Sequence, residues 1–187
     1  MCIRDRPEVD LSLARLVEAD LSGATLTRGY LTDAKLRRAI LRRADLTKVS
    51  MSKANFVRAN LTEAVLVGAD MSETVLIGAN LTGVDLTRAD LSRANLSGAN
   101  LTGADLSRAE LWGANLTGAN LSGATLRRTD LWGATLTGAV LARADLTEAN
   151  LSGVAAERVD WYRANLTDAV VFGATGVPLE EATGPLH

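Results

Sequence analysis

The chain contains very little cysteine, histidine or aromatic residue, and each shortage excludes a class of structure or chemistry. The one cysteine, Cys2, and the one histidine, His187, stand at opposite ends of the 187 residues. One chain therefore forms neither an internal disulfide nor a Cys/His zinc site. Hydrophobic residues make up 47% of the chain but aromatic residues only 4%, so a core must be filled by Leu, Ala and Val. No apolar run approaches the roughly 20 residues of a transmembrane helix. We expect one soluble domain with no metal and no cofactor.

The charged residues are unevenly distributed along the chain, although the net charge is only -2. Residues 1–60 hold twelve Lys or Arg against seven Asp or Glu, a net charge of +5. Residues 61–187 hold eight against fifteen, a net charge of -7. Such a polarised molecule could steer partners or stack head to tail. Solvated surface charge is the simpler interpretation.

The first residues, from Met1 to Arg6, fit a translation of the transposase mosaic end used in sequencing libraries. On this interpretation residues 1–9 are non-native or truncated, Cys2 is not native, and a signal peptide would have been lost. With no targeting segment in view, the cytoplasm is the expected location.

A five-residue repeat runs almost unbroken from residue 10 to residue 175. The central position of each unit, called i here, falls at residues 11, 16, 21 and onward to 171, and Leu fills 27 of these 33 positions. Ala fills 26 of the 33 positions two residues earlier, and the remainder are small or β-branched. Asp or Asn commonly stands at i−1, Ser or Thr at i+1, and Gly or a charged residue at i+2. Such regularity indicates a repeat architecture.

Neither standard periodicity can bury a leucine every five residues on one side. On an α-helix successive leucines would rotate by about 140°, and on a flat strand they would alternate between faces. A chain that turns by about 90° after each unit directs every leucine toward one axis. Four units then close a square coil, and coils stack at about 4.8 Å. The 33 units predict about eight coils and a rod on the order of 40 Å long.

Departures from the repeat predict how the rod turns and ends. Recurrent glycine at i+2 favours tight turns with positive φ. Small Ala156 beside large Trp161 indicates volume compensation in the last coil, with a local bulge as the alternative. We expect residues 176–187 to form a tail whose first four residues, with Pro178 among them, cover the C-terminal edge.

The sequence resembles the pentapeptide-repeat family, whose consensus A(D/N)LXX is seen in residues 94–98 (Ala-Asn-Leu-Ser-Gly) and 104–108 (Ala-Asp-Leu-Ser-Arg). The resemblance covers nearly the whole chain after residue 9. It implies an all-β, right-handed quadrilateral β-helix; the periodicity itself leaves the hand open. The role usually supposed for this family is a non-catalytic scaffold or protein-interaction module.

Nothing in the repeat predicts catalysis. Asp, Ser and Thr are abundant at every surface position, so carboxylate and hydroxyl pairs carry no signal. A nucleophilic hydroxyl needs an activating base, usually histidine, and the one histidine is terminal. A stacked rod has flat faces, not the cleft that a carboxylate pair would flank. We expect no enzymatic activity.

Three aromatic residues break the hydroxyl pattern on one face. Trp112 and Trp132 occupy i+1 in adjacent coils, Phe172 lies two coils further on, and Tyr162 falls on the opposite face. Exposed tryptophan is favoured at interaction sites because it offers a large rigid contact area. We interpret Trp112, Trp132 and Phe172 as candidate partner-binding residues; an aromatic ladder that packs only against itself is the alternative.

A basic collar encircles the N-terminal part of the rod and is the candidate anion-binding surface. Asp45 is the one acid that opposes it locally, and no outward aromatic lies within it for base stacking. The collar comprises Lys35, Arg37, Arg38, Arg42, Arg43, Lys48, Lys53 and Arg58.

These observations predict a scaffold rod with an unknown protein partner and leave two rivals. Some pentapeptide-repeat proteins imitate DNA, bind DNA gyrase and protect against quinolones, and the acidic C-terminal part resembles them. The chain departs from them in its net charge of -2, in having no projecting loop, and in a tail without a dimer-forming helix. An anionic membrane or nucleic acid bound by the collar would show steep salt dependence. Nucleic acid is the less favoured partner, and an end-to-end homodimer stays open because coil ends expose unpaired edges.

Overall fold

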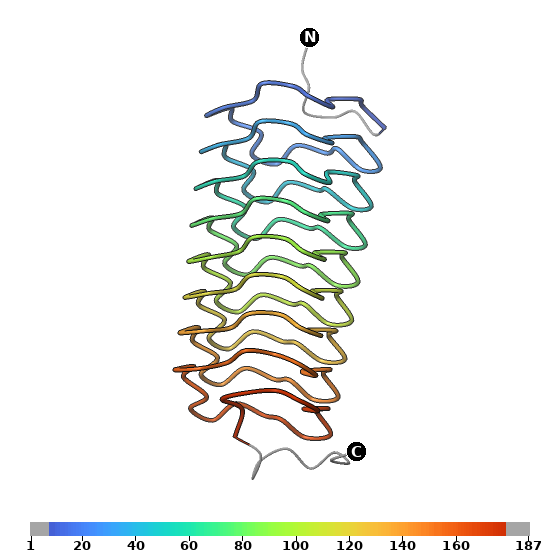
Figure 1. Ribbon diagram of the computed structural model, residues 1–187. Coiled ribbons are helices and arrows are strands. Elements are labelled where there is room, and N and C mark those ends of the chain that lie inside the picture. The colour runs from blue at the N-terminus through green and yellow to red at the C-terminus, as the bar shows by residue number, and fades with distance from the viewer. Residues whose placement is uncertain (1–7, 179–187) are drawn as a thin grey trace.

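The computed structural model describes residues 8–178, which form one rod of stacked coils (Figure 1). The expectations about residues 1–7, about Leu179 and about the rest of the C-terminal tail lie outside the described residues. Among residues 8–178 the structure contains no helix with the length and apolar character needed to span a bilayer.

Twenty residues make one coil. Parallel β-bridges join residues twenty apart without interruption, from Asp10–Tyr30 at one end to Ala155–Thr175 at the other. Each bridge is a single residue at i−1, followed two residues later by a two-residue turn, and residues 8–178 contain no longer strand and no helix. Four five-residue units per coil confirm the register predicted from the repeat.

The hydrogen bonds of one unit explain the residue preferences of the repeat. All five backbone N–H groups of the unit donate to an acceptor. In residues 94–98, the N–H groups of Asn95, Leu96 and Gly98 donate to carbonyls of neighbouring coils, and that of Ala94 donates to the preceding leucine carbonyl. The Ser97 N–H, at i+1, instead donates to Oδ1 of Asn95 at 3.1 Å. An Asp or Asn at i−1 therefore satisfies an N–H group that no carbonyl reaches.

The turn at i+2 uses the left-handed backbone conformation in every unit. Gly98 has φ of +61° and Arg93 has φ of +55°, and the same region is adopted at each i+2 position from Glu8 to Gly173. The prediction of positive φ at the glycines is confirmed, but 21 of these positions are not glycine. The conformation costs a non-glycine residue about 1–2 kcal/mol, and the ladder bonds on both sides hold it in place.

The core is a continuous column of leucine and alanine along the rod axis. The Leu and Ala positions from Leu21 to Leu151 are almost entirely fully buried, and Phe56 and Met71 replace leucine without exposure. The hydroxyl of buried Thr129, which replaces an alanine, donates to the Leu106 carbonyl at 2.7 Å. The predicted inward columns are therefore confirmed, and no buried side-chain polar atom in the described residues lacks a partner.

The two ends of the described rod differ in how the core is covered. At the C-terminal end, the half-buried Trp161 donates its indole N–H to the Gly176 carbonyl at 3.0 Å, and Val177 is 9% exposed. At the other end the inward Leu11 and Leu16 are only half-buried. Gly176 and Val177 thus pack at the C-terminal end of the rod; the covering of the edge by the whole segment stays a prediction.

Candidate interaction surfaces

The three candidate aromatic residues lie on one side of the rod, which we call the tryptophan face. It comprises the outward side chains of the units centred at residues 31, 51, 71 and onward in steps of twenty to 171. Trp132 is 56% exposed, Phe172 is 69% exposed, and Trp112 is half-buried. Other i+1 positions of this face, such as Ser92 and Ser152, carry small hydroxyl side chains, so the rings stand above a low surface.

Trp112 and Trp132 differ because a cation covers the first ring. The guanidinium of Arg93 lies over the Trp112 indole, 4.5 Å from the ring centroid. Within residues 8–178 the structure records no cation over Trp132. Trp132 and Phe172 are therefore largely open to solvent, and the self-packed ladder stays a prediction.

A column of carboxylates runs beside the aromatic rings on the same face. Parallel bridges stack Asp70 on Asp90, Asp90 on Glu110, and Glu110 on Asp130. The described ion pairs, which join Arg38–Glu18, Arg43–Glu63, Arg127–Asp145 and Arg128–Glu148, all lie on other faces. Counting Glu73 and Arg93, the face carries five acids and one base from Asp70 to Asp130, a local charge of -4.

The basic collar is distributed around the rod, as the sequence predicts, but two of its cations form ion pairs that the sequence does not predict. Arg38 pairs with Glu18 at 3.2 Å and Arg43 pairs with Glu63 at 2.6 Å. The interpretation of Asp45 as the one opposing acid is wrong, because the structure brings in acids twenty residues away in adjacent coils. Six collar cations have no ion pair in the described part of the chain: Lys35, Arg37, Arg42, Lys48, Lys53 and Arg58. Their anion-binding role stays a prediction.

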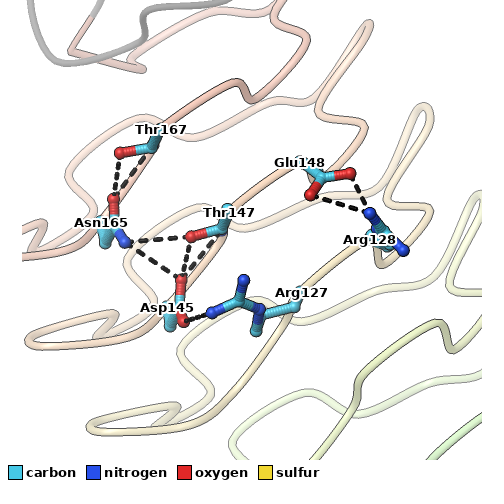
Figure 2. A network of polar contacts seen from close by, with 7 residues as sticks. All are labelled: Arg127, Arg128, Asp145, Thr147, Glu148, Asn165 and Thr167. Carbon is cyan, nitrogen blue, oxygen red and sulfur yellow. Dashed lines mark hydrogen bonds and ion pairs between the residues drawn. The ribbon is translucent and has the colours of Figure 1, made fainter.

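A second charged region is a polar network near the C-terminal end of the rod (Figure 2). Asp145 accepts hydrogen bonds from the Thr147 backbone at 3.0 Å and from Arg127 at 3.2 Å, and Asn165 of the next coil donates to it at 3.3 Å. Arg128 forms two bonds to Glu148, at 2.7 Å and 3.0 Å. The network joins adjacent coils, and its charged groups pair with one another. This arrangement indicates a structural role.

The network predicts acid sensitivity. Burial raises the pKa of Asp145, but its hydrogen bonds with Thr147 and the nearby Arg127 outweigh burial, and the net pKa lies below its ordinary value. The hydrogen bond from Arg128 is the largest cause that lowers the pKa of Glu148. Groups whose pKa is lowered by folding stabilise the fold above their unfolded pKa, and this contribution is lost as pH falls through the folded pKa.

We therefore expect the urea midpoint of the protein to be flat near neutral pH and to fall below about pH 4.5. A Glu148→Gln variant is expected to be less stable than the parent at pH 6, and the difference is expected to shrink at pH 2. Urea titrations of both proteins at the two pH values measure this. A difference between them that persists unchanged at pH 2 would contradict the assignment.

No metal centre is found in the described residues: no group of three or more His, Cys, Asp or Glu side chains within residues 8–178 could hold an ion. The candidate interaction surfaces are the tryptophan face and the basic collar.

Comparison with known proteins places this architecture in a family. The family model described as pentapeptide repeats matches eight copies over residues 14–52, 54–93, 94–133, 126–160 and 144–174. No curated protein sequence matches the chain.

Two solved structures are similar to this chain. HetL from the cyanobacterium Nostoc sp. strain PCC 7120, a pentapeptide repeat protein involved in heterocyst differentiation regulation, is 36% identical. That comparison covers 91% of this chain and 84% of HetL, with a TM-score of 0.49. Full-length QnrB1, a plasmid-mediated fluoroquinolone resistance protein, is 18% identical over 97% of this chain and 92% of its own, with a TM-score of 0.53. The likeness to QnrB1 is one of fold. With eight matched copies along its length, the chain belongs to the pentapeptide-repeat family.

Proposed function

We propose that this chain is a non-catalytic scaffold rod that binds a protein partner through the tryptophan face. The observation that carries the proposal is the exposure of Trp132 and Phe172 in a column that, apart from Trp112, consists of small hydroxyl residues. Large rigid rings that become desolvated at the centre of an interface contribute most of the binding energy in many complexes. About eight coils, wound in the right-handed sense that the family resemblance implies, would hold these rings at a constant spacing.

The scaffold itself supports this role. The ladder continues through every described coil, so Trp112 and Trp132 project from adjacent rungs whose separation is set by backbone hydrogen bonds. Side chains held on a rigid framework lose little conformational entropy when they bind. A partner would therefore meet a preorganised surface.

The binding proposal predicts that the Trp112→Ser/Trp132→Ser double variant loses the partner while remaining folded. Serine already occupies the equivalent positions of neighbouring coils, so the fold should accept it. The measurement is recovery of the partner by the tagged protein, with circular dichroism to verify folding. A Tyr162→Ser variant, changed on the opposite face, is the matched control and should retain the partner. Unchanged recovery by the double variant would refute the assignment.

A DNA-mimicking protein that binds DNA gyrase is the second candidate. The observation that favours it is the acidic column from Asp70 to Asp130, whose carboxylates form no ion pair in the described residues. Purified protein should then inhibit gyrase supercoiling at near-stoichiometric concentration and lose this effect at higher salt. The absence of inhibition at low salt would remove this candidate and leave the scaffold proposal in place.

A further inference from the structure

The internal contact between Arg93 and Trp112 shows what chemistry the tryptophan face accepts. Arg93, at i+2 of one coil, places its guanidinium over the indole of Trp112 at i+1 of the next coil. A guanidinium stacks on an indole through attraction to the ring's negative face. The acidic column beside the rings adds negative charge along the edge of this contact.

The same position is vacant over the next ring. One coil beyond Arg93, the i+2 residue that would reach over Trp132 is Gly113. Gly133, Gly153 and Gly173 continue this column, so a strip without side chains runs beside Trp132 and Phe172. The structure thus has an arginine over the first ring and open space where an equivalent side chain would cover the second.

The acidic column beside this strip contains no ion pair in the described residues, although Asp130 accepts a hydrogen bond from the Asn150 amide at 2.8 Å. Carboxylates that stack directly opposite each other in adjacent strands repel. Elsewhere on the rod arginine pairs with Asp145 and Glu148, whereas the stacked Asp85 and Asp105 of another face also have no described ion pair. No described ion pair relieves Glu110 or Asp130. Stacked carboxylates that have no internal ion pair present a negative surface that is complementary to a cationic partner.

We propose that the tryptophan face binds a basic, arginine-bearing segment of a protein partner. One partner guanidinium stacks on Trp132, in the place that Arg93 takes over Trp112, and its neighbours pair with the carboxylates of Glu110 and Asp130. Arginine is favoured over lysine because its planar group both stacks and forms bidentate bonds to carboxylates. This inference rests on the proposed function, since it names the partner chemistry of the same surface.

A substitution that fills the vacant position tests this proposal. Gly113→Arg places an internal guanidinium where the partner's would lie. The fold should accept it, because the backbone at i+2 already carries arginine at Arg93, and a Cβ at Gly113 would meet Arg93 Cγ at 3.7 Å, an ordinary contact. Gly103→Arg is the matched control: it makes the same change of charge at the same turn on the opposite face, with nothing within 4 Å of the new Cβ.

The probe is an unstructured peptide of alternating Arg and Gly, titrated into the full chain by calorimetry at low and moderate salt. We expect the parent to bind the peptide more weakly as salt is raised. The Trp132→Ser and Gly113→Arg variants should bind it about threefold to tenfold more weakly than the parent, and Gly103→Arg should lower the affinity by less. A lysine analogue of the peptide should bind more weakly than the arginine peptide.

Four outcomes would overturn the proposal. Equal affinity for the arginine and lysine peptides would exclude guanidinium stacking on Trp132. Equal losses of affinity in Gly113→Arg and Gly103→Arg would show that the effect comes from net charge alone. A concentration-dependent dimer in sedimentation, abolished by Gly113→Arg, would show that a second copy occupies the face. If the peptide does not bind but recovery of the natural partner still depends on Trp112 and Trp132, the arginine chemistry is refuted and the proposed function remains.

Discussion

Replacing Leu106 with alanine is expected to lower the free energy of unfolding by about 2–5 kcal/mol, the range found for buried leucine. Leu106 is fully buried near the middle of the rod. Leu86 and Leu126 stack below and above it in the same column, and ladder hydrogen bonds fix the distance between coils. The surroundings therefore cannot collapse into the cavity, and the loss should lie toward the upper part of that range. Urea denaturation followed by circular dichroism measures it.

The matched control is Leu13→Ala, which removes the same atoms from a side chain that is 72% exposed. Its effect should stay within about 0.5 kcal/mol, as is usual for surface substitutions. Similar losses for the two variants would show that the inward leucines do not provide the stability of the rod. This comparison tests the core that the five-residue spacing predicts.

Replacing Gly176 with alanine is expected to detach the C-terminal cap. A Cβ at this position would lie 2.4 Å from the Ala156 carbonyl oxygen, and φ is +71°. Because both the clash and the backbone oppose any side chain, the segment must move and the Trp161 indole must lose its bond to the Gly176 carbonyl. We expect a loss of about 1–3 kcal/mol and a shift of Trp161 emission to longer wavelength.

Trp161 emission can be followed alone in a Trp112→Phe/Trp132→Phe background. Gly118→Ala is the control, since φ there is +65° but nothing lies within 4 Å of the added Cβ. It should cost about 1 kcal/mol through the backbone conformation and leave Trp161 emission unchanged. If Gly176→Ala costs no more than Gly118→Ala, the cap does not depend on the close approach of Gly176 to Ala156.

The core and the coil register could be predicted because they depend on spacing alone. A leucine every five residues admits one simple packing, and every described bridge joins residues twenty apart. The left-handed turns were predictable at glycines such as Gly98 but not at Arg93, because arginine does not ordinarily prefer positive φ. The ladder imposes that conformation on whichever residue stands at i+2.

The surface contacts were harder to predict because long side chains reach sideways as well as along their column. The position of Trp132 on an open face follows from the twenty-residue register. The stacking of Arg93 on Trp112 does not, since these residues are nineteen apart and belong to adjacent columns. The bonds that Asn95 and its equivalents make to the i+1 N–H could have been inferred from the recurrence of Asp and Asn, which often bond to the backbone two residues on.

Site-specific photo-crosslinking tests the central claim, that the tryptophan face contacts a partner, most directly. A crosslinking residue at Ser152, between Trp132 and Phe172 in the i+1 column, would be compared with one at Ser122 on the opposite face. Both positions are half-buried serines in the same kind of turn, so the two reagents are matched. We expect a discrete adduct from Ser152 that disappears in the Trp112→Ser/Trp132→Ser background, and none from Ser122. Equal adducts from both faces, or an adduct from Ser122 alone, would contradict it.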